Sequence, residues 1–339
     1  MDPSGVAISE FMARPYVVAE VASAHEGSVE RAKAIARAAC DAGADAVKFQ
    51  VWSRDEGVTP DHPDYETLGR IEFSPAQWGD ILENARALGL TVAADVDDQA
   101  SMNLALAHGV ELLKIRTSNL AHHAFLTAVA AVGKPILLAV GAATTAEIET
   151  ALRVLDDKQA RQVVLLHGFQ AFPTQPGDTH LRTLGHLRQR YGRPVGYADH
   201  ADGDSPLAFL LPAAALAAGA CLIEKHITLD REKRTEDYES SLNPPDFARL
   251  IEQLRQVWAA LGSAQRELTP AEQKYRLRFN KCIVARRDIA AGSVIETGML
   301  AFKRSGKPGL PPDEAHRLIG KRTARPLAAD APLRTEDMR

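Results

Sequence analysis

Ionisable side chains stand at or just beyond the ends of seven of eight short apolar runs that recur along this chain. They are Glu20, Lys48, Asp95, Lys114, His167, Asp199, His200, Glu224, Lys225 and His226. A charged group in or beside a buried strand is costly unless it is paired or takes part in a reaction. A single such residue is usually structural, but their recurrence along the chain favours a shared site.

Two of these residues have the chemistry of metal ligands. His200 and His226 follow runs that are consecutive along the chain, and neutral imidazoles with room for further ligands suit a catalytic divalent metal. The alternative is a pair of structural histidines, one capping a loop and one bonded to a backbone carbonyl. Position alone leaves these two interpretations even.

Two lysines and one loop carboxylate are also candidates. Lys48 and Lys114 lie two runs apart, and ammonium groups that converge suggest an anionic substrate, a phosphate or a carboxylate. The alternative is that Glu20 and Glu224 neutralise them. Asp237 lies in the charged segment 231–239, and because charge runs in loops are usually solvated, its position alone predicts a surface residue.

The apolar runs predict the strands that position these residues, at 16–21, 46–50, 90–94, 111–115, 135–140, 162–167, 194–197 and 220–224. The runs are continuous rather than alternating, which is typical of parallel strands covered on both faces. Helical segments separate them, and Ser74 followed by Pro75 indicates one helix start. This pattern favours a (β/α)8 TIM barrel over an open doubly wound sheet, with the active site at the C-terminal ends of the strands.

The last part of the chain differs from the rest in its pattern of residues. The barrel is predicted to span residues 1–262 and to end with a helix over 245–261. Residues 263–279 are polar and charged, and we interpret them as a linker with a helical stretch near Pro270. Residues 280–339 predict a small β-rich module, with strands at 282–285 and 292–295 and a loop rich in Gly and Pro.

Composition limits the classes of function. The 339 residues carry a net charge of -4, which gives no reason to expect a nucleic-acid or membrane partner. Residues 1–15 lack the basic and apolar regions of a signal peptide, and no apolar run approaches the ~18–20 residues of a membrane span. Cys40, Cys221 and Cys282 lie far apart. They fit a reducing cytoplasm, where we expect the protein, and argue against disulfides and a thiolate zinc site.

The strand-end segments resemble those of the sialic acid synthases, the N-acetylneuraminate synthase family. The resemblance is carried by residues 18–27, 42–50, 114–115, 133–136, 196–200 and 223–228, of which the last two are the most specific. Residues 283–292 resemble the start of the antifreeze-like (SAF, β-clip) domain that closes these enzymes. The resemblance therefore covers nearly the whole chain, in order.

This resemblance implies a reaction and roles. The family condenses phosphoenolpyruvate with an N-acetylated aldose, using Mn²⁺ or Mg²⁺ as a Lewis acid for the aldehyde. His200 and His226 would hold the metal, and Glu20 would orient or deprotonate the attacking water. Lys48 and Lys114 would hold the phosphate and carboxylate of the donor. Further substrate contacts would be Gln50, Thr117, Gln170, Phe172, Asp199, Lys225, Asp237 and Lys281. The small domain would cover the barrel mouth of a partner subunit, in a domain-swapped homodimer.

Several side chains differ from the family pattern. Ala24, Ala139 and Ala198 stand where the pattern has polar side chains, and each missing charge-assisted hydrogen bond weakens anion binding by about 1.5–3 kcal/mol. An aldolase or lyase that uses a donor other than phosphoenolpyruvate is therefore an alternative, and a non-catalytic sugar-binding homologue is a third. The third is disfavoured by five retained residues, Glu20, Lys48, Lys114, His200 and His226.

Overall fold

A closed parallel barrel forms the first of two compact units. The computed structural model describes residues 7–339, and the chain divides into Met1–Gly262 and Ser263–Arg339. In the first unit a short ninth strand, β9 (Ser241–Leu242), pairs with β8, and eight strands form the closed barrel, in which they pair in sequence order and β1 pairs with both β2 and β8. They are β1 (Tyr16–Glu20), β2 (Ala46–Val51), β3 (Thr91–Val96), β4 (Leu112–Ile115), β5 (Ile136–Ala139), β6 (Val163–His167), β7 (Val195–Asp199) and β8 (Leu222–Ile227). The predicted barrel is confirmed, and the open sheet is excluded.

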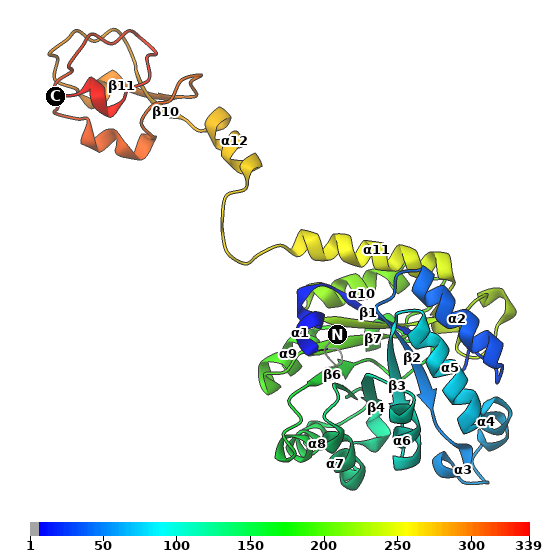
Figure 1. Ribbon diagram of the computed structural model, residues 1–339. Coiled ribbons are helices and arrows are strands. Elements are labelled where there is room, and N and C mark those ends of the chain that lie inside the picture. Colours follow the sequence, from blue (N-terminus) through cyan, green and yellow to red (C-terminus); the bar gives the residue numbers. More distant parts are fainter. Residues whose placement is uncertain (1–6) are drawn as a thin grey trace. The chain divides into compact units, whose positions relative to one another are not determined.

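One long helix follows each strand and packs on the outside of the barrel (Figure 1). These helices are α2 (Val29–Asp41), α5 (Pro75–Ala87), α6 (Gln99–Ala107), α7 (His123–Val132), α8 (Thr145–Asp157), α9 (Arg182–Tyr191), α10 (Leu207–Ala217) and α11 (Pro244–Leu261). The predicted start of α5 is confirmed, because the Ser74 hydroxyl accepts a hydrogen bond from Gln77 N and Pro75 occupies the first turn. Two short helices, α3 (Arg54–Gly57) and α4 (Tyr65–Ile71), lie between β2 and α5.

The barrel interior is a packed core with a polar upper layer. Alternate residues of each strand point inward, and the inward positions nearer the strand starts form one apolar cluster that includes Val18, Leu112, Leu137 and Leu222. Phe11 of α1 (Ile8–Ala13) joins this cluster and is fully buried. Two residues further along β1, β2, β3, β4 and β8, the inward positions are ionisable, namely Glu20, Lys48, Asp95, Lys114 and Glu224. The strand period therefore places the charged groups at the C-terminal end of the barrel, where barrel enzymes have their active sites.

Four strands extend further than their apolar runs predict, since β2 ends at Val51 and β3 at Val96, beyond the predicted 50 and 94. β7 ends at Asp199 and β8 at Ile227, whereas the predicted strands end at 197 and 224. Asp199, Lys225 and His226 therefore lie within strands rather than after them. All three are buried, and the strands can continue through Asp199 and Lys225 because these two side chains bind each other.

The second unit comprises α12 (Pro270–Phe279) and a small β-rich body. Its antiparallel strands are β10 (Cys282–Ala285) and β11 (Leu300–Lys303), around a core that includes Ile283, Leu318 and Leu333. The strand predicted at 282–285 is confirmed. The one predicted at 292–295 is wrong, since this segment makes only an isolated bridge from Val294 to Arg322. Residues 263–279, predicted as a linker, group with this unit rather than standing apart.

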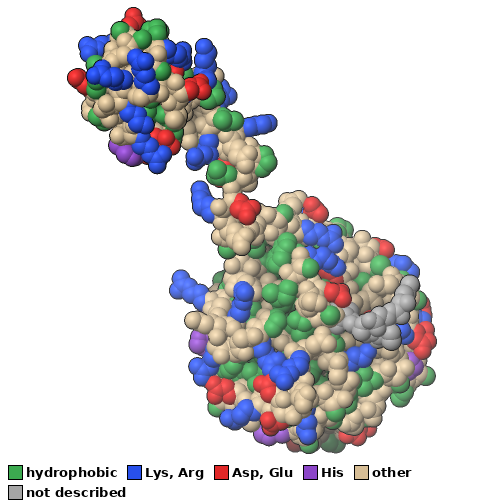
Figure 2. Space-filling view, turned by 60° about the vertical axis from the view of Figure 1, so that its left-hand side comes forward, with side chains coloured by type: hydrophobic (Ala, Val, Ile, Leu, Met, Phe, Trp, Pro, Cys, Tyr) green, Lys and Arg blue, Asp and Glu red, His purple; other side chains and the backbone are tan. Residues whose placement is uncertain are grey.

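Lys and Arg side chains are spread over the face of the second unit that Figure 2 shows. Residues 263–339 contain 16 Lys and Arg against 9 Asp and Glu, whereas residues 1–262 contain 24 against 35. The two units therefore carry opposite net charge. Within residues 7–339, no helix is both long and apolar enough to cross a membrane. The prediction that residues 1–15 are not a signal peptide falls partly on residues 1–6, which lie outside the described residues.

Candidate active site

A cavity of about 400 Å³ opens at the C-terminal end of the barrel. Ten of the predicted site residues line it, namely Glu20, Lys48, Gln50, Lys114, Thr117, Gln170, Phe172, His200, His226 and Asp237. Strand register explains part of this convergence, because Glu20 lies level with Lys48 on one side and with His226 on the other. Asp199, Lys225 and Lys281 are not among the lining residues.

Lys48 is the centre of a buried ionic cluster. Its side chain is fully buried, and its Nζ lies 2.6 Å from Glu20 Oε2, 2.6 Å from Asp95 Oδ2 and 3.5 Å from Glu224 Oε1. Lys114 Nζ donates to the same Glu224 oxygen at 2.7 Å and lies 3.6 Å from Asp95. These contacts agree with the alternative interpretation from the sequence, in which carboxylates neutralise both lysines.

Three carboxylates contact these two ammonium groups, so negative charges outnumber positive ones by one. The carboxyl group whose ionisation is disfavoured as a result is that of Glu20. Burial, with repulsion from Glu224, outweighs attraction by Lys48 and raises the pKa of Glu20 to about 7. Burial also opposes ionisation of Asp95 and Glu224, but the two lysines outweigh it and lower the pKa of both. Glu20 is therefore the carboxyl group that can exchange a proton near neutral pH.

Gln50 and Arg116 extend this cluster across the cavity. Gln50 Nε2 donates to Glu20 Oε1 at 2.8 Å, and Arg116 Nη2 donates to Gln50 Oε1 at 2.8 Å. Arg116 Nη1 also lies 3.2 Å from Asp97. The two bonds orient the Gln50 amide, so that its NH2 group faces the carboxylate of Glu20.

The two predicted metal ligands lie side by side. The ring centroids of His200 and His226 are 5.3 Å apart. Burial lowers the pKa of His200 to about 4, and burial together with the neighbouring His200 lowers that of His226 well below its usual value. Both rings are therefore neutral at pH 7, as ligation requires. Nδ1 of each ring is buried without a hydrogen-bond partner.

These histidines fit a metal with few protein ligands. A buried polar nitrogen without a partner calls for an ion, a water or a special role, and here two such nitrogens occur together. Among residues 7–339, no group of three or more His, Cys, Asp or Glu side chains has the arrangement of a complete metal site. The residues present therefore fit an ion held by two imidazoles, with substrate or water completing its coordination.

Asp199 and Lys225 lie behind the cavity and bind each other. Lys225 Nζ donates to Asp199 Oδ2 at 2.6 Å and to Ala201 O at 3.0 Å, and Tyr197 OH donates to Asp199 Oδ1 at 2.8 Å. Each precedes one of the candidate ligands in the chain. This geometry does not support direct substrate contact for the pair, and it favours a role in fixing the backbone beneath His200 and His226.

Asp237 does not lie at the surface as its charged surroundings predict. Its Oδ2 accepts a hydrogen bond from Ser23 N at 3.1 Å, and the side chain lines the cavity. Burial raises its pKa. The surface interpretation of Asp237 is therefore wrong, whereas the resemblance placed it at the cavity. On the opposite wall the Phe172 ring stands edge-on to His200, with centroids 4.6 Å apart.

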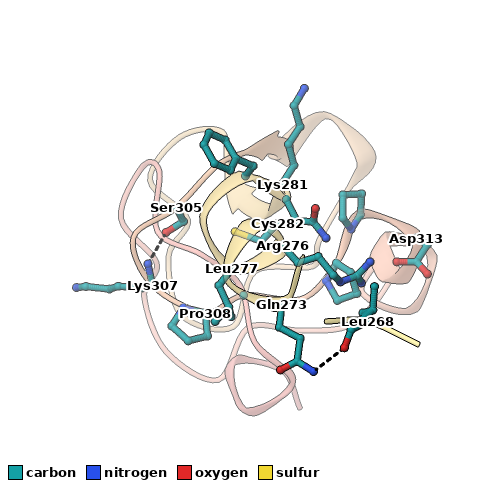
Figure 3. A pocket seen from close by; sticks show the side chains of 15 residues that line it. Leu268, Gln273, Arg276, Leu277, Lys281, Cys282, Ser305, Lys307, Pro308 and Asp313 are labelled. Carbon is teal, nitrogen blue, oxygen red and sulfur yellow. Dashed lines mark hydrogen bonds between the residues drawn. The ribbon is translucent and has the colours of Figure 1, made fainter. Parts of the chain in front are cut away.

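Lys281 lies in the second unit, on a groove of about 870 Å³ between α12 and the β-rich body (Figure 3). Among the residues that line this groove, Gln273 Nε2 donates to Leu268 O. The groove is larger than the barrel cavity, but its lining contains no histidine and a single carboxylate, Asp313. We therefore place the chemistry in the barrel, and a substrate contact by Lys281 stays a prediction.

Sequence reasoning gave no role to Arg116. It directly follows β4, at the same C-terminal end of the barrel as the other site residues. Its position, one residue beyond the predicted strand 111–115, is the same signal that singled out Asp95 one residue beyond 90–94. Conversely His167, singled out at a strand end, bonds through Nε2 to Thr179 O and does not line the cavity.

Two protein-family models match the chain, the NeuB family model over residues 35–266 and the SAF domain model over residues 280–339. The chain belongs to the NeuB family. The predicted resemblance and the predicted SAF domain are both confirmed.

Named relatives of this NeuB-family chain are synthases of acidic sugars. An N,N'-diacetyllegionaminic acid synthase of Legionella pneumophila is 28% identical, with 94% of this chain and 93% of that protein covered. An N-acetylneuraminate-9-phosphate synthase of Mus musculus is 27% identical, with 95% and 92% covered. A crystal structure of the N-acetylneuraminic acid synthetase of Leptospira borgpetersenii matches at a TM-score of 0.73, with 29% identity over 78% of this chain and 92% of that one. The chain is accordingly an enzyme of the sialic acid synthase type, a class that forms carbon–carbon bonds.

Proposed function

We propose that this enzyme condenses phosphoenolpyruvate with an aldose, releasing phosphate and forming a sialic-acid-like sugar acid, with a divalent metal at His200 and His226. The observation that carries the proposal is the pair of neutral, buried imidazoles whose Nδ1 atoms lack partners. They lie in the same cavity as Glu20, whose pKa is about 7. Mn²⁺ and Mg²⁺ are the metals we expect.

Charge in the cavity supports a metal. Four carboxylates line it, those of Glu20, Asp95, Glu224 and Asp237, against the three cations of Lys48, Lys114 and Arg116. With both histidines neutral, the lining has no excess of positive charge to attract an anionic donor. A bound divalent ion would supply that charge and polarise the aldehyde oxygen.

The side chains have separate tasks in this proposal. Carbon 3 of phosphoenolpyruvate forms a bond to the aldehyde carbon, water adds to carbon 2, and phosphate leaves from the same carbon. Ionised Glu20 takes the proton of that water, since its pKa near 7 makes it an effective base at neutral pH. Lys114 holds the donor's anionic groups, and Lys48 keeps Asp95 and Glu224 ionised. Phe172, which lines the cavity, contacts the acceptor sugar.

A phosphate-release assay tests the proposal. The enzyme is incubated with phosphoenolpyruvate, Mn²⁺ or Mg²⁺ and a panel of N-acetylated, di-N-acetylated and phosphorylated aldoses. Release that requires both an aldose and the metal supports the synthase. No release with any aldose, in a protein shown by calorimetry to bind Mn²⁺, contradicts it and turns attention to the aldolase or lyase alternative. The His200→Ala, His226→Ala double variant is expected to lose both metal binding and release.

The opposite charges of the two units support the homodimer that the resemblance implies. A basic module with 16 Lys and Arg against 9 acids would be attracted to the acidic barrel of a second chain. Lys281 would then face the partner's cavity. Light scattering at low and high salt measures the assembly, and a monomer at both salt concentrations would contradict the homodimer.

A further inference from the structure

The lysines of the barrel cavity have few donors left for a ligand. Lys48 is fully buried, with three carboxylates within 3.5 Å of its Nζ. An ammonium group has three donors, so those of Lys48 are taken. Lys114 spends its strongest hydrogen bond on Glu224, and only 12% of its side chain is exposed. Anion binding by these lysines alone would therefore be weak.

Arg116 is more exposed at the cavity than either lysine. Its side chain is 34% exposed and lines the same cavity. Within the described residues, its guanidinium donates a hydrogen bond to the side chain of Gln50, from Nη2 to Oε1. The nearest oxygens of Asp97 and Asp95 lie 3.2 Å from Nη1 and 3.8 Å from Nε, as ion pairs without hydrogen-bond geometry.

The guanidinium therefore keeps spare donors at the cavity. Five N–H groups belong to an arginine side chain, and one of them is given to Gln50. Neither Nε nor Nη1 is among the atoms that are buried without a partner, so both are open to solvent. A planar edge with adjacent N–H groups matches the two oxygens of a carboxylate or a phosphate. The bond to Gln50 and the two aspartates hold the guanidinium in place before a ligand arrives.

We propose that Arg116 binds an oxyanion of the substrate, a carboxylate or a phosphate, and thereby helps to select anionic substrates. The identity of the substrate rests on the function proposed above, whereas anion binding itself does not. Two sources carry this chemistry, the phosphoenolpyruvate-like donor and a phosphorylated or acidic acceptor sugar.

Direct binding tests the inference without turnover. Calorimetry with Mn²⁺ present measures phosphoenolpyruvate and inorganic phosphate on the full-length wild type and on Arg116→Met, Arg116→Lys and Arg190→Met. Loss of one charge-assisted contact predicts affinity about ten- to hundred-fold lower in Arg116→Met. Arg116→Lys should lose less, because it keeps the charge but not the fork. Arg190, bonded to Glu149 on the outer surface, is the matched control and should bind as wild type does.

Two further readouts keep the outcome unambiguous. Thermal unfolding verifies that each variant is folded, and Arg116→Lys, which still compensates Asp95 and Asp97, serves if Arg116→Met is not. Where the enzyme turns over, a raised KM for phosphoenolpyruvate assigns the oxyanion to the donor, and a raised KM for phosphorylated aldoses alone assigns it to the acceptor. If the wild type releases no phosphate but Arg116→Met still loses anion binding, the proposed reaction fails and the inference stands. Folded variants that bind both anions within two-fold of wild type, or a wild type that binds neither, would overturn it.

Discussion

Replacing Glu20 by Gln should remove the acid limb of the pH–rate profile. The pKa of Glu20 is raised from an ordinary 4.5 to about 7, by burial first and by Glu224 second. A shift of that size corresponds to about 3 kcal/mol between its two protonation states. If ionised Glu20 is the base, about half of the enzyme is competent at pH 7 and about nine-tenths at pH 8.

The assay is phosphate release between pH 5.5 and 9 at saturating metal. Wild-type kcat/KM should rise tenfold per pH unit below about 7 and then level off. Glu20→Gln should be slower by about 10²- to 10⁴-fold, with no limb near 7, while Glu20→Asp should keep a limb at reduced rate. Because an amide is nearly isosteric and its oxygen can still accept from one of the two donors, Gln50 or Lys48, thermal unfolding should show a folded variant. A Glu20→Gln enzyme with the wild-type rate, or with an unchanged acid limb, would refute the assignment.

Three further predictions concern stability, measured by denaturant unfolding. Lys48→Met should cost about 3–5 kcal/mol, because it leaves buried carboxylates without their cation, whereas Lys33→Met, at an exposed ion pair, should cause no measurable loss. His25 is 2% exposed, and burial lowers its pKa to about 4. The unfolded chain therefore binds more protons between pH 6.5 and 4, so stability falls by about 3 kcal/mol from His25 as pH drops through this window, and His25→Phe should flatten that slope. Leu112→Ala, inside the barrel, should cost about 2–5 kcal/mol, and an unchanged midpoint would contradict the packed interior.

The barrel could be predicted because its strands are buried on both faces. That burial produces the continuous apolar runs, and the spacing of the runs matches one helix after each strand. The prediction failed where polar residues continue a strand. Lys225 and His226 ended the predicted run, yet both lie in β8, because Lys225 pairs with Asp199 of β7. A partner on a neighbouring strand is a tertiary fact that local hydropathy does not contain.

The site was predictable to the extent that strand ends meet in a barrel. Glu20, Lys114 and the two histidines converge because their strands do. Asp237 was misplaced by position alone, since its segment is charged and folds back only through contacts such as the bond from Ser23 N. In the second unit, the predicted strand at 292–295 failed because Ile295 alone packs into the core, whereas Val294 is exposed and makes only an isolated bridge.

Carbon-13 NMR of the product tests the central claim most directly. Phosphoenolpyruvate labelled at carbon 3 is incubated with the enzyme, Mn²⁺ and the aldose that gives the fastest phosphate release. The proposed condensation predicts that the label appears as a methylene carbon bonded to the former aldehyde carbon of the sugar, and that the His200→Ala, His226→Ala double variant gives no such signal. Label found only in the methyl group of pyruvate, with phosphate released, would show hydrolysis without carbon–carbon bond formation and would contradict the account.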